Sequence, residues 1–212
     1  MKTITIASAK GGSGKSTIVS SLAVRAAQDT ANVGMIDLNP DQASLTHWWH
    51  IRNPSGSPMW PRLISDVENI PRDVRAFARK GFEWLFIDTP PADMDLIEQA
   101  IAVSDAVLIP VRTSFFDVIA VQAVLDMCRD QRKPFAFVLS AVDGQFKKST
   151  TQAIMALKRL GPLLQTHVSH RQPYLQALLI GKTGPELEKR LRPEIDALWS
   201  EVKQLVEKGR AQ

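Results

Sequence analysis

A stretch near the start of the chain has the residue types and spacing needed to bind phosphate. It consists of Lys10, Gly11, Gly12, Ser13, Gly14, Lys15, Ser16 and Thr17. Glycines let the backbone curl tightly, so that several N–H groups point inward at an anion. A lysine in the place of Lys15 reaches the β- and γ-phosphates of a nucleotide, and a hydroxyl in the place of Ser16 binds Mg²⁺. We therefore predict nucleotide contacts along 10–17, with Ser16 as a metal ligand.

The residues on either side of this stretch predict the elements that would position it. Ile4–Ala7 is a short apolar run typical of a buried β-strand, and Ile18–Val24 has helical spacing. The helix would add the positive end of its dipole to the anion site. Strand, glycine-rich turn and helix together are the context that a phosphate-binding loop requires.

Two carboxylates follow apolar runs further along the chain. Asp88 ends the run Trp84–Ile87, and Asp37 ends Val33–Ile36. In parallel α/β folds, ligands bind where the carboxyl ends of the strands meet. We therefore predict that Asp88 holds Mg²⁺, the alternative being that it caps a helix, since aspartate favours such turns.

Apolar runs and helical patterns alternate along most of the chain. This alternation predicts an α/β fold: a doubly wound, mostly parallel twisted sheet with helices on both faces, in a single domain over 1–212. Leu163–Val168 could add an edge strand. Further strands are expected at Ala106–Val111 and Phe135–Leu139, and helices at Pro71–Lys80, Leu175–Ile180 and Pro193–Lys208.

The composition is that of an ordinary globular protein. Of 212 residues, 44% are hydrophobic and 23% charged, and Cys128 is the sole cysteine, which excludes an internal disulfide and suits a reducing cytoplasm. No apolar run reaches the ~18 residues of a membrane span. Because the chain begins directly with strand residues, we expect no secretory signal.

The net charge of +4 is unevenly distributed along the chain. Residues 1–144 carry 14 basic and 16 acidic residues, whereas 145–212 carry 12 basic and 6 acidic. No acidic residue lies between Asp143 and Glu186. A one-sided basic region favours a polyanion partner such as nucleic acid, although a solvated face would have the same composition. The candidate phosphate contacts are Lys147, Lys148, Lys158, Arg159, Arg171 and Lys182.

The loop pattern is K-G-G-x-G-K-[ST], with Ala9 where an ordinary phosphate loop has its first glycine. It resembles the deviant Walker A motif of the ParA/MinD family of ATPases. The resemblance implies a P-loop NTPase in which two subunits sandwich two ATP·Mg²⁺. It also implies that Lys10, without a partner in a single subunit, crosses the dimer to the other subunit's phosphates and joins Lys15 in catalysis, while Gly12 allows the subunits to approach closely.

Asp37 begins a second stretch that is similar to a family motif. The family commonly has D-x-D-P-Q after the second strand, and its first aspartate positions the attacking water; Asp37 matches that place. This chain has Asn39 for the second aspartate and an additional Asp41 before Gln42, a departure from the motif that bears on hydrolysis more than on nucleotide binding. The segment Ile109–Asp117 is also similar to a family segment that lies near the nucleotide.

The resemblance implies a short ParA-type ATPase of the cytoplasm and nucleoid. It would bind DNA without sequence preference as an ATP-bound homodimer and release it on hydrolysis. It would thereby partition or position a plasmid, a chromosome or a large protein assembly, without a membrane. A ParB-like or cargo-adaptor protein would stimulate hydrolysis.

Three other functions remain open from the sequence. A MinD-like ATPase would bind membrane through its C-terminal helix, but the apolar stripe from Ile195 to Val206 lies inside the helix and favours packing. A dethiobiotin-synthetase-like enzyme would share the fold and need a small substrate. A nucleotide-binding scaffold with negligible hydrolysis would fit the altered segment after Asp37. The histidine pairs His47/His50 and His167/His170 lack a third ligand for a metal.

Overall fold

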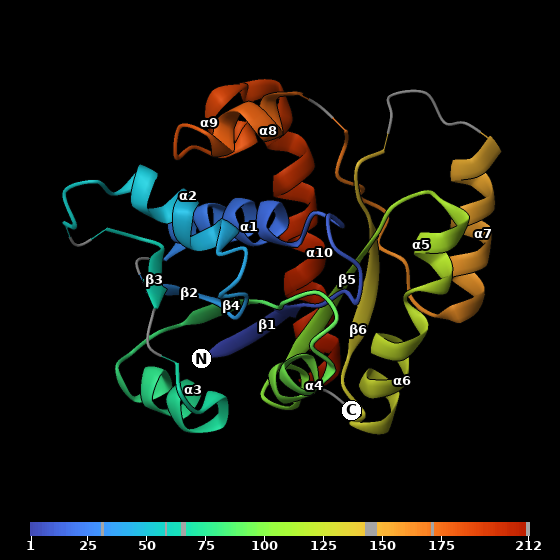
Figure 1. The fold of residues 1–212 in the computed structure, drawn as a ribbon, viewed down its shortest axis with the longest axis horizontal. Helices are drawn as coiled ribbons and strands as arrows, with labels where there is room; N and C mark the ends of the chain where they lie inside the picture. The colour runs from blue at the N-terminus through green and yellow to red at the C-terminus, as the bar shows by residue number, and fades with distance from the viewer. Residues whose placement is uncertain (31, 58, 65–66, 143–147, 171, 211–212) are drawn as a thin grey trace.

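The computed structural model describes residues 1–30, 32–57, 59–64, 67–142, 148–170 and 172–210, which form a parallel sheet between helices (Figure 1). The six strands lie in the order β3-β2-β4-β1-β5-β6, and every pairing is parallel. The predicted doubly wound α/β fold is therefore confirmed. The strands are β1 (Lys2–Ile6), β2 (Val33–Asp37), β3 (Arg62–Ile64), β4 (Trp84–Asp88), β5 (Ala106–Val111) and β6 (Phe135–Leu139).

Helices cover both faces of the sheet, and Figure 1 shows α1 and α2 above it and α3 and α4 below. The side chains of α1, α2 and α10 share one apolar cluster with β1, while α4, α6 and α7 share another with β5 and β6. The helices are α1 (Lys15–Asp29), α2 (Ser44–Arg52), α3 (Ile70–Arg79), α4 (Met94–Ala102), α5 (Phe115–Ile119), α6 (Gln122–Asp130), α7 (Lys148–Leu160), α8 (Gln172–Leu178), α9 (Gly184–Leu187) and α10 (Arg192–Arg210), with a 3-10 turn at Lys189–Leu191.

The long C-terminal helix α10 is part of the core. Its apolar stripe, from Ile195 through Trp199 to Val206, is buried against the sheet and α1. The ring of Trp199 meets that of Trp84 edge to face, with 4.5 Å between their centroids. The prediction that this stripe packs inside the protein is confirmed. Within the described ranges, no helix combines the length and apolarity required to cross a bilayer.

Proline 110 lies inside β5, where a proline normally removes a ladder hydrogen bond. The backbone N–H and C=O groups of the odd-numbered residues of β5 point toward β6. The N–H of Val107 donates to Pro134, and the carbonyl of Val111 accepts from Ser140. Pro110 therefore faces β1, where the pairing extends to the N–H of Ala7, which donates to Leu108. The missing N–H lies at the next position of this ladder, so it ends the pairing with β1 while β5 continues alongside β6 to Val111.

The two outer edges of the sheet differ from expectation. The predicted edge strand Leu163–Val168 forms no continuous ladder; the chain follows β6 through isolated bridges at Leu163 and Ser169. Pro162 begins this segment without a backbone N–H, which limits regular pairing. At the other edge, the short strand β3 was not predicted, because three residues show no periodicity that a pattern could detect.

Candidate nucleotide-binding site

The stretch 10–17 forms a tight loop between β1 and α1. Gly12 and Gly14 both have positive φ, 71° and 94°, a region that side chains with a Cβ rarely adopt. Gly14 precedes the first residue of α1, and its carbonyl accepts the helix's first backbone hydrogen bond, from Ile18. The glycines at these two places are thus required by the turn that brings Lys15 to the start of the helix.

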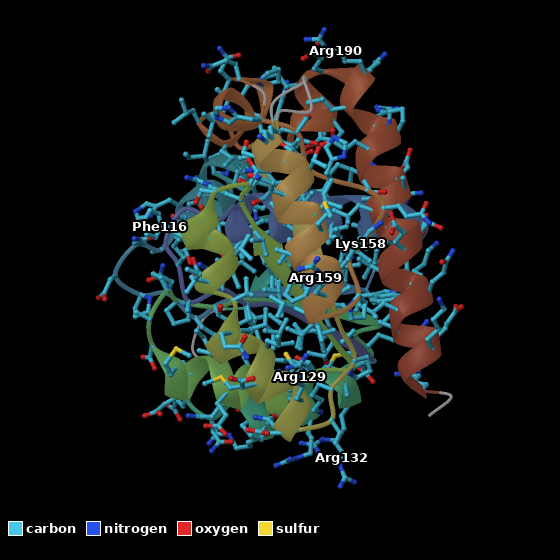
Figure 2. The ribbon with its side chains drawn as sticks, turned by 90° about the vertical axis from the view of Figure 1, so that its right-hand side faces the viewer. Phe116, Arg129, Arg132, Lys158, Arg159 and Arg190 are labelled. Carbon is cyan, nitrogen blue, oxygen red and sulfur yellow. The ribbon has the colours of Figure 1, made fainter. Side chains whose placement is uncertain are left out.

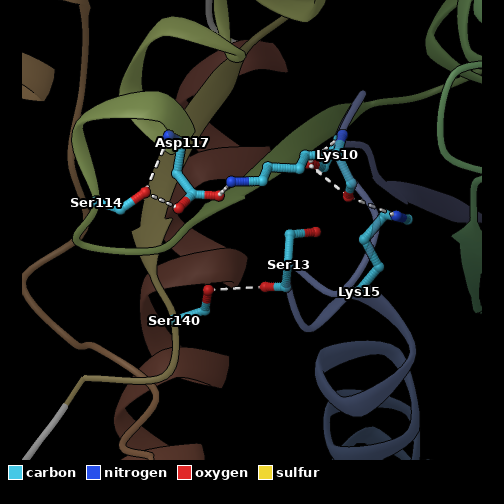
Figure 3. Close-up of polar contacts among 7 residues, drawn as sticks. Lys10, Ser13, Lys15, Ser114, Asp117 and Ser140 are labelled. Atoms are coloured by element: carbon cyan, nitrogen blue, oxygen red, sulfur yellow. Dashed lines mark hydrogen bonds and ion pairs between the residues drawn. The ribbon is translucent and has the colours of Figure 1, made fainter.

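A cavity of about 340 Å³ opens above this loop. The loop and the first turn of α1 form one wall, and residues 168–170 with α8 form the opposite wall, where Tyr174, Leu175 and Leu178 provide apolar surface. Ser140, at the end of β6, donates a hydrogen bond of 2.7 Å to the carbonyl of Ser13 and fixes the loop to the sheet (Figure 3). Sequence reasoning missed Ser140, because nothing in the local pattern links it to the loop.

Lys15 is almost fully buried, with 7% of its surface exposed. Its Nζ lies 3.4 Å from the carbonyl oxygen of Lys10, which is a long contact for an ammonium group. Burial lowers the pKa of Lys15, and the negative charge of Asp88 opposes this shift. An ammonium with so few partners in a buried place can be stabilised by a bound anion.

Asp37 and Asp88 are brought side by side by the sheet, since they are register partners at the ends of β2 and β4. Asp88 is only 2% exposed, and its Oδ1 has no hydrogen-bond partner among the described residues. Burial raises the pKa of Asp88 to about 7; a hydrogen bond from Ser16 and the charge of Lys15 oppose the rise, and Asp37 adds to it.

A divalent cation fits the chemistry of this place. The unpartnered carboxylate oxygen of Asp88 and the hydroxyl of Ser16 are hard oxygen ligands of the kind that Mg²⁺ prefers. A cation there would also compensate the buried negative charge. The predicted metal pair, Ser16 and Asp88, is therefore close together and chemically suitable.

Asp37 is held by its own chain through both carboxylate oxygens. One carboxylate oxygen accepts from the N–H of Asn39, and the other accepts from both the N–H and the hydroxyl of Thr46, all at 3.0 Å. Thr46 lies in the first turn of α2, so Asp37 holds the start of that helix beside the end of β2. The oxygen bonded to Thr46 accepts two hydrogen bonds, whereas the oxygen bonded to Asn39 accepts one and keeps one acceptor site for a water.

Lys10 lies on the outer side of the loop, where it is paired within its own chain. Its Nζ is 2.7 Å from Oδ1 of Asp117, and the lysine side chain is 42% exposed whereas that of Asp117 is 7% exposed (Figure 3). Asp117 is held in turn by Ser114, whose side chain caps α5. The expectation that Lys10 lacks a partner in a single subunit is therefore wrong: Asp117, distant in sequence, neutralises it.

The segment Ile109–Asp117 lies beside the loop, as expected, and it also contributes Arg112. This arginine lines the cavity, and its guanidinium would be 3.2 Å from a Cβ placed on Gly12. Gly12 therefore leaves room for a cation of the same chain next to the phosphate site. Sequence reasoning did not select Arg112, although it directly follows a buried strand that ends near the loop.

The candidate DNA contacts do not form one cluster. Lys158 and Arg159 lie together on the outer surface of α7 (Figure 2), and Lys148 starts the same helix roughly 15 Å away. Lys182 is exposed at the turn before α9. This turn lies beside α2, since the carbonyl of Lys182 accepts a hydrogen bond from the indole of Trp48. Lys147 and Arg171 lie outside the described residues.

Comparison with known proteins agrees with this geometry. The family model described as the CobQ/CobB/MinD/ParA nucleotide binding domain matches residues 4–183. The chain is 30% identical to the "Maintenance of carboxysome distribution protein A" of Halothiobacillus neapolitanus, over 94% of this chain and 95% of that protein.

Solved structures share the fold. The ATP complex of a McdA variant from Cyanothece superposes with a TM-score of 0.72 at 21% identity, covering 98% of this chain and 96% of the other. The septum site-determining protein MinD from Pyrococcus horikoshii, complexed with Mg-ADP, gives 0.77 at 15% identity, with 98% of both chains covered. The family match over most of the chain, together with a phosphate loop that meets two strand-end carboxylates, shows that this protein belongs to the CobQ/CobB/MinD/ParA nucleotide-binding family.

Proposed function

We propose that the chain is a single P-loop ATPase domain, 1–212, that dimerises when it binds ATP and positions a large protein assembly on DNA. The observation that carries the proposal is the placement of two lysines on opposite sides of one loop. Lys15 lies inside, toward the cavity and Asp88, while Lys10 lies outside, half exposed. A loop that served only its own nucleotide would need no second cation on the outer side.

The cavity suits a nucleoside triphosphate with Mg²⁺. The loop N–H groups and Lys15 would hold the phosphates, and Ser16 and Asp88 would hold the metal, which supplies charge neutralisation during phosphoryl transfer. The apolar wall of Tyr174, Leu175 and Leu178 offers a surface for a base. Relatives that bind ATP or Mg-ADP with the same fold support this assignment.

The second subunit would complete the site. Lys10 would leave Asp117 and contact the phosphates bound by the other copy, where a second cation offsets charge that develops on the γ-phosphate. Dimerisation would then depend on ATP, since two cationic loops repel each other without a triphosphate between them.

The proposed nucleic-acid partner is DNA, which the protein would bind without sequence preference. The exposed cations of α7, at Lys148, Lys158 and Arg159, lie on a helix with no acidic residue. Binding through phosphates releases counterions, so it should weaken steeply as salt increases. Anisotropy of a labelled duplex, measured with ATP across a salt series, tests this. A salt-independent or sequence-dependent affinity would contradict it.

For the cargo, we propose a large protein assembly of the microcompartment type. The relative from Halothiobacillus neapolitanus is named for carboxysome distribution, and the similarity extends over nearly the whole length of both chains. An adaptor protein on the cargo would stimulate hydrolysis, and hydrolysis would release the dimer from DNA.

The substitution Lys10→Ala tests the dimer. We expect the variant to retain nucleotide binding but to stay monomeric in light scattering with a slowly hydrolysed ATP analogue, while the wild type doubles in mass. Arg75→Ala is a matched control, because Arg75 is exposed on α3 and has no ion pair with any described residue. An intact ATP dimer of the Lys10 variant would reject the proposed role of this lysine.

One observation favours a second candidate, a nucleotide-dependent switch with very slow hydrolysis. The carboxylate of Asp37 is largely engaged in holding its own chain: one oxygen accepts twice from Thr46, so only the oxygen that accepts from Asn39 has a site left for water. Turnover of ATP with and without DNA separates the two functions. Measurable turnover that falls strongly in Asp37→Asn supports the ATPase, and none under any condition supports the switch.

A further inference from the structure

A second and larger hollow lies at the other end of the sheet from the phosphate loop. Its volume is about 630 Å³, and it is formed where α6 ends, β6 begins and α10 passes. We call it the cationic groove and define it by its rim and floor, which are Arg129, Arg132, Lys133 and Lys208 at the rim and Leu163 and Leu205 at the floor.

The charge of the groove is strongly one-sided. Among the residues that line it, Glu201 is the single acid, and its two oxygens already accept from the N–H groups of Gln165 and Thr166, at 2.8 and 2.9 Å. Arg132 and Lys208 are exposed and have no carboxylate partner within the described part of the chain. Two cations at the rim are thus free to meet an anion.

Arg132 occupies a backbone position that ordinarily selects a different residue. Its φ is 53°, and the N–H groups of Arg132 and Lys133 donate back to Arg129 and Cys128, which is the pattern of a glycine-terminated helix. Glycine or asparagine would fit this turn with less strain. The chain instead places a long cation there. Arg132 lines the groove and lies at the outer end of the molecule (Figure 2).

The floor distinguishes between two kinds of anionic partner. Leu163 and Leu205 give the groove an apolar bottom between charged walls. A DNA backbone has no apolar group to bury there, whereas a protein segment can place an aliphatic or aromatic side chain on the floor and carboxylates at the rim.

We propose that the cationic groove is a docking site for an acidic segment of a partner protein that inserts one large apolar side chain. The site is independent of the nucleotide. β6 begins at this end of the sheet, whereas the phosphate loop follows the carboxyl end of β1, so a dimer joined through the loops leaves the groove open. A partner could therefore remain bound through the whole ATP cycle.

The test uses fluorescence anisotropy with a labelled peptide of aspartate and glutamate around a central Leu-Trp pair. We expect saturable binding that is equal with and without an ATP analogue. In the double variant Arg132→Asn/Lys208→Gln, the affinity should fall about tenfold or more, since charge-assisted bonds are lost. Asparagine tolerates the positive φ at 132, and thermal melting checks that the variant is folded.

Two controls make the test decisive. Lys158→Gln/Arg159→Gln removes two cations from the neighbouring surface of α7, outside the groove, and should leave peptide binding unchanged while weakening binding of a labelled DNA duplex. A peptide with Ser-Ser in place of Leu-Trp should bind less tightly. Equal binding of that peptide, or an equal loss of DNA and peptide binding in the groove variant, would overturn the proposal.

Discussion

The inner and outer sides of the phosphate loop contain the same kinds of residue in opposite states. Inside, Lys15 and Asp88 are buried and have few partners. Burial lowers the pKa of Lys15 and raises the pKa of Asp88, which favours the neutral form of each. Outside, the partly exposed Lys10 forms a close ion pair with the buried carboxylate of Asp117. A bound ligand would stabilise the charged forms of the inner groups, whereas the outer pair must separate before Lys10 can contact another anion.

This difference separates binding from assembly. A nucleotide with Mg²⁺ would relieve the inner side without moving the outer pair, so binding alone need not produce a dimer. The outer pair adds a free-energy cost of about 1 kcal/mol or more to association, because Lys10 is partly exposed but the buried carboxylate of Asp117 loses its cation when the pair separates. Substitutions on each side can therefore test whether the two functions are distinct.

The largest expected effect is that of Asp88→Asn on the free energy of unfolding, measured without ligands. The pKa of Asp88 is about 7 in the folded protein and 3.8 as its ordinary value, so the folded state retains a proton that the unfolded state loses. The stability of the wild type therefore falls as pH rises from about 4 to 7, by up to about 4 kcal/mol. The variant lacks this titration and should become the more stable protein across that range.

Thermal melts in the presence of a chelator, from pH 5 to pH 8, measure this directly. The melting temperature of Asp88→Asn minus that of the wild type should increase with pH and level off above about 7. The four histidines are common to both proteins and cancel in the difference. A difference in melting temperature that does not change with pH would show that the pKa of Asp88 is not raised in the folded protein.

Next in size is Lys15→Ala. We expect nucleotide affinity to fall about hundredfold, close to 2.7 kcal/mol, because a charge-assisted phosphate contact is lost. Lys10→Ala should change the same affinity by less than about threefold, since its pair with Asp117 faces away from the subunit's own cavity. Titration calorimetry compares the two. Equal losses would remove the distinction between the sides.

The smallest effect is expected for Asp117→Asn. The amide keeps the shape of the side chain and can still accept from Ser114, but it frees Lys10 from its ion pair. The ATP-bound dimer should therefore tighten about fivefold, as expected when about 1 kcal/mol is no longer needed to separate the pair. Sedimentation across protein concentrations measures this, with Asp126→Asn on the surface of α6 as the control. A weaker dimer would mean that the pair persists in the assembled state.

The parts of the fold that sequence predicted are those in which one local pattern determines one element. The apolar runs ending at Asp37 and Asp88 became neighbouring strands, and parallel pairing then placed their carboxylates together without further information. The loop 10–17 was similarly determined by its own residues. The stripe of α10 also indicated its burial correctly, because its period matches a helix with one covered face.

The features that sequence did not predict depend on contacts between distant residues. Asp117 reaches the loop from α5, and Ser140 reaches it from the residue after β6; no local pattern in the sequence marks either contact. The cationic groove could not be predicted from the sequence for a related reason. Arg129 has Asp130 beside it and Asp126 three residues earlier, so the local charge cancels in sequence although the acids do not line the groove.

Both edges of the sheet are poor templates for another strand. β3 has three residues, and beyond β6 the chain runs irregularly from Pro162 to Ser169 with isolated bridges only. Long exposed edges invite sheets of different molecules to join and aggregate, and short or interrupted edges prevent it. The proposed assembly around a cargo and on DNA would raise the local concentration of the protein. Such edges would then let the faces at the phosphate loops meet reversibly, as proposed, while limiting pairing between sheets.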